Sequence, residues 1–393
     1  MPVRATKRGA DRTRLQRDCD VLVCGASFAG LAVARELAGT GAEVLVVDRY
    51  DIGERQTSAC GIPTSWLTAL ELGSSMRQSF DALVVHTPFL TSRWQLPWTF
   101  STFDYRELCG LLWEQARTPT LEFETAAVTG RIGNTVYTDR GELHAPLVVD
   151  GLGWRRVLSN GKAIQPPAAR LSRGLEVHPA GTGSDMELWL DAGYVRAGYS
   201  WSFPAGDELR VGVGSFWPTH HVKEPTVRLA GDLGLPPDGY QGNWIPHQLR
   251  RAVEDGIFFV GDSAGHCLPL TAEGIRTALY FGLACGRELR AVLDGTRTRD
   301  QALARYAAFS DAHARKFRWL LAVQRAVGQI TPSRAASAIV KAFESRRLTR
   351  WAFSHYLEIA PPSFAGGGLH PRSSSASASR RTPSSIAGSA RLA

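Results

Sequence analysis

The stretch DVLVCGASFAGLAVARELAGTGAEVLVVD, residues 20–48, decides the fold of this chain. It opens with a short β-branched run over 20–25 that ends in glycine, which predicts a buried strand. Apolar side chains then recur at helical spacing over 28–39, and a second β-branched run covers 43–48. Strand, helix and strand in such close succession make a βαβ unit, so we expect a parallel sheet.

The turn between the first strand and the helix is rich in glycine. In GASFAG, residues 25–30, Gly25 suits a tight turn and Gly30 lets helix and strand pack closely, while Ser27 stands where a middle glycine is usual. The start of the helix offers free N–H groups to phosphates. Asp48 ends the second strand, where an acid can hold the hydroxyls of an unphosphorylated ribose. We therefore predict a Rossmann-type site for FAD or NAD rather than NADP.

The charge of the chain is uneven. Its 393 residues carry a formal net charge of +8. Residues 1–17 hold six basic side chains and one acidic one, and residues 366–393 hold four arginines and no acid. The remainder sums to −1, so we attribute the basicity to two solvated ends and expect no nucleic-acid partner. The composition predicts disorder over 1–17 and over 361–393.

Cysteine spacing and hydropathy narrow the class of protein. The six cysteines show no Cys-x-x-Cys spacing, so we expect neither a disulfide framework nor a metal site. There is no run of about 18 apolar residues to span a membrane, and no apolar signal region follows the charged start. We expect a cytoplasmic protein, with peripheral contact at the membrane face as an open alternative.

The chain beyond residue 48 mixes helical and strand patterns. Residues 171–217 alternate apolar and polar side chains, which predicts antiparallel sheet. The other predicted elements are helices over 104–116, 272–293 and 299–328 and strands over 142–150 and 256–261.

Three further stretches resemble a known group of flavoproteins. GDSAGHCLPLTAEG, residues 261–274, resembles the second flavin motif of the p-hydroxybenzoate-hydroxylase-like flavoproteins. DYREL, residues 104–108, and VVDG, residues 148–151, resemble two more of their motifs, in the same order. The resemblance covers most of residues 18–295 and implies one FAD per chain.

The resemblance also implies an architecture and a set of cofactor contacts. Asp262 would bind the ribitol chain, Pro269 would lie beside the flavin ring, and Arg106 would contact the phosphate region. The fold expected is α/β, with a Rossmann-type FAD-binding domain (18–165 and 245–295), an inserted antiparallel β-sheet substrate domain (166–244) and C-terminal helices (296–360). The cofactor-binding residues expected are Gly25, Ala26, Ser27, Ala29, Gly30, Asp48, Arg49, Arg106, Asp150, Gly261, Asp262, Pro269, Gly274 and Ile275.

Two shorter stretches resemble the geranylgeranyl reductases within that group. GYSWSFP, residues 198–204, is similar to their Tyr-x-Trp-x-Phe-Pro signature. Alternation along a strand puts Tyr199, Trp201 and Phe203 on one face, which the resemblance implies lines a cavity for a prenyl chain. A packed sheet core is the alternative.

The second of these stretches contains a cysteine. SACG, residues 58–61, is similar to a Cys-Gly pair in a loop over the flavin, although here Ile62 and Pro63 replace the further glycines. The resemblance implies that Cys60 lies near the cofactor and supplies a proton. A small buried hydrophobe is the alternative for this cysteine.

These resemblances imply an FAD-dependent oxidoreductase that reduces C=C bonds of an apolar, isoprenoid-like substrate by hydride transfer from reduced flavin. No second Rossmann unit is visible, so NAD(P)H or another reductant would bind transiently. A flavin monooxygenase or halogenase of the same fold, and an electron-transfer or quinone-linked flavoprotein, are the alternatives. The sequence leaves the oligomeric state open.

Overall fold

A mostly parallel sheet forms one half of the molecule, as the βαβ pattern predicts. The structure, a computed structural model, describes residues 13–56, 58–160, 170–330 and 333–367. The six-stranded sheet has the order β17-β18-β11-β2-β3-β7, and all its neighbours are parallel except β17 and β18. Its strands are β2 (Val21–Cys24), β3 (Val44–Asp48), β7 (Leu121–Thr125), β11 (Leu147–Asp150), β17 (Val253–Glu254) and β18 (Ile257–Phe259).

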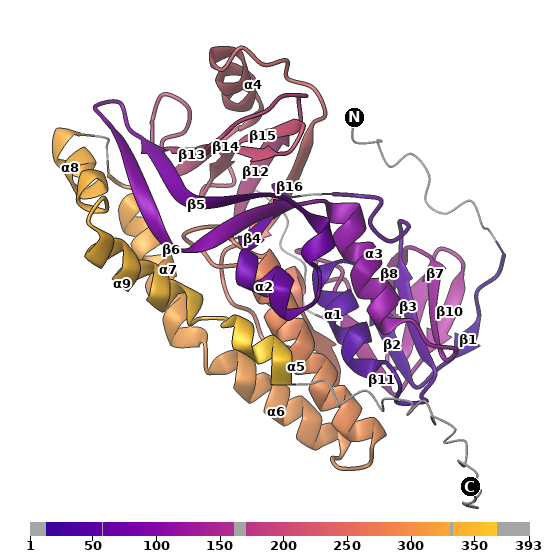
Figure 1. Ribbon diagram of the computed structural model, residues 1–393. Coiled ribbons are helices and arrows are strands. Elements are labelled where there is room, and N and C mark those ends of the chain that lie inside the picture. Colours follow the sequence, from indigo (N-terminus) through magenta and orange to yellow (C-terminus); the bar gives the residue numbers. More distant parts are fainter. Residues whose placement is uncertain (1–12, 57, 161–169, 331–332, 368–393) are drawn as a thin grey trace, which may run out of the picture.

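Helices α1 (Phe28–Leu37), α3 (Tyr105–Ala116) and α5 (Ile275–Leu293) lie beside this sheet (Figure 1). Two glycines of α5 bring it close to α1. A Cβ on Gly282 would stand 2.6 Å from the carbonyl oxygen of Ala29, and one on Gly286 would stand 2.9 Å from that of Val33. Because only glycine fits at such distances, the long C-terminal helix packs directly on the first helix of the βαβ unit.

A small four-stranded sheet extends the same half of the molecule. Its order is β1-β10-β9-β8, and its strands are β1 (Arg17–Asp18), β8 (Val128–Ile132), β9 (Thr135–Thr138) and β10 (Gly141–His144). The single strand predicted over 142–150 is therefore two strands in different sheets. The disorder predicted for 1–17 does not hold for Arg17, whose guanidinium Nη1 lies 2.5 Å from a carboxylate oxygen of Glu122. Residues 1–12 lie outside the described residues.

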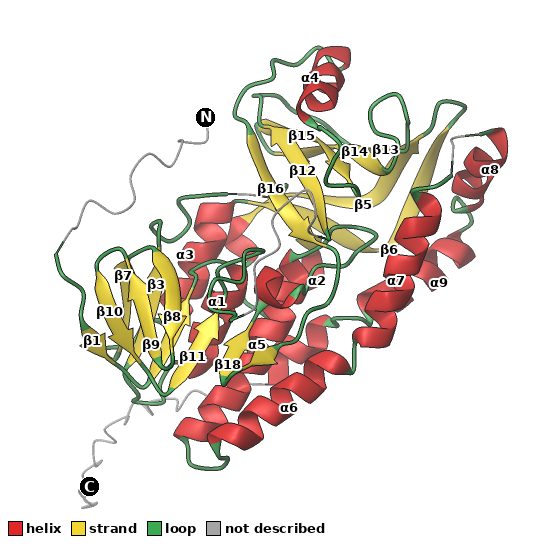
Figure 2. Ribbon diagram, turned by 180° about the vertical axis from the view of Figure 1, so that it is seen from behind, coloured by secondary structure: helices red, strands yellow, loops and turns green. Residues whose placement is uncertain are grey.

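An eight-stranded sheet forms the second half, with the order β16-β12-β15-β14-β13-β5-β6-β4 (Figure 2). The predicted substrate domain, 166–244, omits three of these strands, which come from residues 61–103. They join because β5 pairs in parallel with β13, and Leu83, Val85 and Leu96 share a core cluster with Met186. The strands are β4 (Gly61–Pro63), β5 (Met76–His86), β6 (Thr91–Phe103), β12 (Leu171–Val177), β13 (Met186–Trp189), β14 (Gly198–Ala205), β15 (Glu208–Ser215) and β16 (Gln241–Pro246).

The C-terminal helices over 314–357 run alongside this second sheet, whereas the helix over 299–311 packs on α5 and lies beside β18 of the first sheet (Figures 1 and 2). The helix predicted over 299–328 is in fact two, separated at Ala312 and His313. The Trp94 ring of β6 packs against Phe343 and Phe353, with centroids 4.9 and 6.4 Å away. The helices are α6 (Arg299–Asp311), α7 (Ala314–Val327), α8 (Arg334–Ala342) and α9 (Arg346–Leu357), while α2 (Thr64–Ala69), α4 (Lys223–Asp232) and the short η1 (Gly73–Ser75), η2 (Gly261–Ala264) and η3 (Pro362–Gly367) lie elsewhere.

The segment directly after α9 packs against the rest of the protein, contrary to the prediction from its composition. Disorder predicted from residue 361 does not hold for 361–367, because Phe364 packs on Tyr280 with centroids 4.5 Å apart and Ala365 is buried. The indole Nε1 of Trp66 also donates to the Ala360 carbonyl at 3.1 Å. Residues 368–393 lie outside the described residues. No helix among the residues that the structure describes is long and apolar enough to cross a membrane.

Candidate active site

One large cavity joins the two halves of the molecule. Its volume is about 2040 Å³, against roughly 300–1,000 Å³ for an ordinary ligand pocket. Its walls come from the residues that follow β2, β3, β11 and β18, from one face of the eight-stranded sheet, and from helices α7 to α9. The carboxyl ends of parallel strands are where such sheets bind ligands. The cavity has room for two ligands at once.

The glycine-rich turn forms one end of this cavity. Gly25 has a φ of 110°, and a Cβ there would stand 2.4 Å from the Gly151 carbonyl oxygen. A Cβ on Gly30 would stand 1.8 Å from the carbonyl oxygen of Gly25. Both glycines are therefore required by packing, which is the role predicted for them, and neither lines the cavity. Ala26, Ser27 and Ala29 do line it, at the N-terminus of α1.

Asp48 holds the turn in place as well as facing the cavity. Its two carboxylate oxygens accept from the backbone N–H of Ala26 at 2.8 Å and of Tyr50 at 3.1 Å. Burial raises the pKa of Asp48, although these two donors oppose the rise. Arg49 beside it is exposed, lines the cavity and stacks its guanidinium 4.9 Å from the Tyr50 ring centroid.

Asp262 is a hydrogen-bond acceptor for which the described residues provide no donor. It is half-buried in η2 and lines the cavity, and no hydrogen bond to its carboxylate exists within the described part of the chain. Burial raises the pKa of Asp262 to about 6, and the charge of Arg250 opposes the rise. The carboxylate is thus ionised at neutral pH and free to accept from ligand hydroxyls. Gly261 precedes it on the wall, and Gly274 and Ile275 line the same region at the start of α5.

Besides Gly25 and Gly30, three more of the expected cofactor residues lie away from the cavity wall. Asp150 is fully buried and accepts from the Leu152 and Leu158 N–H groups and from Ser263 Oγ at 2.6 to 2.9 Å, so it ties β11 to η2. Arg106 is exposed on α3 and Pro269 is buried, and neither is among the lining residues. Their contacts with a cofactor stay predictions.

Cys60 is also placed away from the cavity. Its side chain is fully buried, and burial raises the pKa of the thiol well above its ordinary value. Its neighbours Ala59 and Gly61 line the cavity, but Cys60 itself does not. The proton-donor role implied for it finds no support in this position. Of the six cysteines, all of which the structure describes, Cys267 is the one that lines the cavity.

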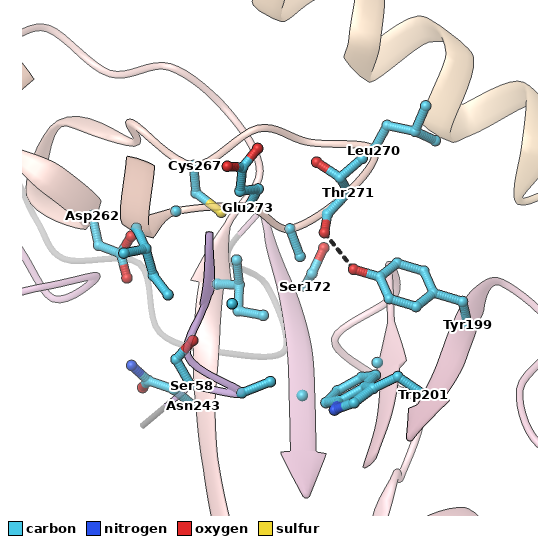
Figure 3. Close-up of a pocket in the computed structure, with 18 of the residues that line it drawn as sticks. Ser58, Ser172, Tyr199, Trp201, Asn243, Asp262, Cys267, Leu270, Thr271 and Glu273 are labelled. Atoms are coloured by element: carbon cyan, nitrogen blue, oxygen red, sulfur yellow. Dashed lines mark hydrogen bonds between the residues drawn. The ribbon is translucent and has the colours of Figure 1, made fainter. Parts of the chain in front are cut away.

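The aromatic face predicted for β14 is confirmed. Tyr199, Trp201 and Phe203 line the cavity, with successive ring centroids 6.0 and 6.4 Å apart. The Trp201 ring lies over β15, since a Cβ on Gly212 would stand 2.3 Å from it. Figure 3 shows Asp262 at one end of the close-up and Tyr199 and Trp201 at the other; Tyr199 donates its hydroxyl proton to the carbonyl of Thr271.

Sequence reasoning missed a row of polar groups behind this aromatic face. Glu176 is buried yet lines the cavity, and it accepts from Trp201 Nε1 at 3.2 Å. Its other oxygen lies 2.9 Å from His178 Nε2. His178 Nδ1 lies 3.7 Å from Glu208, whose side chain is 32% exposed and bonded to Arg210 at 2.8 Å. The signal that could have found them is the spacing of Glu176, in β12, and His178, directly after that strand, since residues two apart in extended backbone point to the same side.

Comparisons with known proteins point to the same group of reductases that the sequence motifs resemble. No protein-family profile matches the chain. Digeranylgeranylglycerophospholipid reductase 3 of Methanosphaera stadtmanae is 24% identical over 348 residues, covering 78% of this chain and 86% of the relative. Digeranylgeranylglycerophospholipid reductase 1 of Methanopyrus kandleri is 25% identical over 358 residues, covering 83% and 94%.

Two solved structures share the fold. A geranylgeranyl bacteriochlorophyll reductase-like protein from Thermoplasma acidophilum has a TM-score of 0.76 at 16% identity and covers 89% of this chain and 98% of its own. A probable FAD-dependent monooxygenase from Pseudomonas aeruginosa has a TM-score of 0.58 at 19% identity, covering 86% and 100%. The fold predicted, that of the p-hydroxybenzoate-hydroxylase-type FAD-dependent enzymes, is confirmed, and so is the resemblance to the geranylgeranyl reductases.

Proposed function

We propose that this chain is an FAD-dependent oxidoreductase that reduces C=C bonds of an apolar, isoprenoid-like substrate. One observation carries the proposal. A single cavity joins a dinucleotide-binding turn to an aromatic, largely apolar chamber, in a chain whose relatives are named as reductases of digeranylgeranyl lipids. The apolar chamber includes Leu83, Val85, Leu96, Met186 and Leu188.

The residues at the polar end fit FAD. The turn at Gly25 and Gly30 leaves no space for side chains, and Asp262 offers an ionised acceptor without a partner among the described residues. Ala26, Ser27 and Ala29 would meet the phosphates at the N-terminus of α1, where the helix dipole favours negative charge. Asp48 and Arg49 would meet the adenosine, Asp262 the ribitol chain, and Gly274 and Ile275 the flavin.

When bound, FAD supplies hydride transfer between a donor and the substrate. NAD(P)H or another transient reductant is the proposed donor. The aromatic face of Tyr199, Trp201 and Phe203 would hold the apolar chain and exclude water from the reacting carbons.

Reduction of a double bond needs a proton as well as a hydride, and the chain offers a route for it. The Glu176 carboxyl lines the cavity beside Trp201 and is bonded to His178, which approaches the partly exposed Glu208. A proton released by Glu176 to the substrate carbon would be replaced from solvent through His178, which is bonded to Glu176 at 2.9 Å and lies beside the partly exposed Glu208. We therefore propose Glu176 as the acid in place of Cys60, with His178 as its positioning residue.

The test is single-turnover oxidation of the reduced protein by a prenyl-bearing lipid without oxygen. The expected result is reoxidation of the flavin together with a product heavier by two hydrogens. A product that forms only when oxygen is admitted would refute the reductase and favour a monooxygenase.

The proposed substrate is a lipid, so we also propose peripheral contact with a membrane surface.

A further inference from the structure

Positive charge is concentrated in the C-terminal helices. Residues 314–360 hold nine basic and two acidic side chains, a net charge of +7. Residues 18–313 carry the opposite sign, with a net charge of −8. Residues 18–365 together have a net charge of only −1, because a negatively charged region and a positively charged region nearly cancel.

The basic side chains of this region are available for binding. Arg315, Arg318, Arg346, Arg347 and Arg350 are exposed on α7 and α9. Within the part of the chain that the structure describes, none of the five forms an ion pair with an acidic side chain. A run of unneutralised arginines attracts anionic surfaces.

Large apolar side chains stand among these arginines. Trp319 is 63% exposed, Trp351 60% and Ile339 63%, and all three also line the large cavity. Exposed residues that line a cavity mark its mouth. Tryptophan is favoured where an apolar phase meets polar headgroups, because its ring is apolar and its N–H is polar. We call these three residues and the five arginines the entrance surface; α7, α8 and α9 lie on the outer side of the molecule (Figure 1).

A second, shallow pocket adjoins Trp351. Its volume is about 320 Å³, and Arg346, Arg347 and Arg350 line it. Each of these guanidinium groups can donate two parallel hydrogen bonds to phosphate oxygens, so the hollow has the chemistry to bind a phosphate group.

We propose that the entrance surface docks on an anionic lipid bilayer. Trp319, Trp351 and Ile339 would enter the boundary between headgroups and acyl chains, and the arginines would contact lipid phosphates. A substrate with long chains would then pass from the bilayer into the cavity without crossing water. Another copy of the same surface is excluded as occupant by like charge. The entrance surface would make the membrane contact proposed above, and its charge and exposed tryptophans do not depend on which reaction the cavity carries out.

The experiment measures binding of the full chain to phosphatidylcholine vesicles with and without phosphatidylserine. Binding is expected with the anionic lipid, weaker without it, and weakened by salt. Arg346→Glu/Arg347→Glu should lower the partition coefficient at least about 100-fold, because four units of charge change at the surface. Trp351→Ala should lower binding to both kinds of vesicle.

The matched control is Arg380→Glu/Arg381→Glu, an adjacent pair with the same change of charge in the C-terminal tail. Melting temperature and FAD content show that each variant is folded. The proposal is overturned if the wild type ignores anionic vesicles, or if the control pair weakens binding as much as the Arg346/Arg347 pair does. Failure of anaerobic turnover with vesicle binding intact would refute the reaction and leave the entrance surface standing.

Discussion

Replacing Asp262 by asparagine should stabilise the protein without its cofactor and weaken FAD binding at the same time. Asparagine keeps the shape of the side chain and removes its charge. In the half-buried position of Asp262, no donor from the described residues compensates that charge, and burial raises its pKa from 3.8 to about 6. A carboxyl group whose pKa is raised by folding stabilises the folded state only while it is protonated.

The magnitude follows from this shift. The stabilising effect of the proton is fully present below about pH 3.8 and is lost as pH rises through 6, because the folded state binds the proton more tightly than the unfolded chain. At pH 8 the ionised Asp262 carboxylate therefore lowers the free energy of unfolding by about 3 kcal/mol. An unfolding entropy of about 2.1 cal/mol/K per residue converts this energy into a melting temperature about 4 °C higher for Asp262→Asn. The gain in stability of Asp262→Asn over the wild type should fall to roughly half of this value at pH 5.

FAD affinity should move in the opposite direction. A hydrogen bond to a charged acceptor contributes about 1.5–3 kcal/mol, so the variant should bind FAD roughly 10- to 150-fold more weakly. Thermal melts of the apoprotein at pH 8 and pH 5, with fluorescence titration of FAD, measure both effects. A lower melting temperature at pH 8 would show that the carboxylate has a donor after all. Unchanged affinity would show that Asp262 does not bind the cofactor.

Four further outcomes can be checked in parallel. Glu176→Gln should retain FAD and its reduction by the donor but slow anaerobic reoxidation by substrate about 100- to 10,000-fold, and an unchanged rate would remove Glu176 from the proton path. Cys60→Ala should lower stability by about 1–3 kcal/mol, because it leaves a buried void, while reoxidation per bound flavin stays nearly constant; a large rate loss would restore its catalytic role. Gly30→Ala should abolish flavin absorbance in the purified protein, since its Cβ would stand 1.8 Å from the Gly25 oxygen, and normal FAD content would contradict the packing argument. Deleting residues 368–393 should leave the melting temperature unchanged, and a clear drop would show that the tail docks.

The sequence by itself determined the features that depend on neighbouring residues. The βαβ unit, the GASFAG turn and the alternation that puts Tyr199, Trp201 and Phe203 on one face all follow from the spacing of consecutive side chains. Such patterns are set by backbone geometry within a few residues, so they can be recognised in the sequence without the tertiary structure.

Only the tertiary structure decided what depends on contacts between distant segments. Residues 61–103 join the second sheet because β5 pairs with β13, about 100 residues later. Cys60 is buried in the main hydrophobic core, whereas Glu176 lines the cavity beside Trp201, whose ring packs over Gly212 of a neighbouring strand. The apolar mouth among the arginines of α7 and α9 likewise exists only when these helices fold beside the cavity. Burial is a property of the whole fold, and one strand's pattern does not specify which distant partner will cover it.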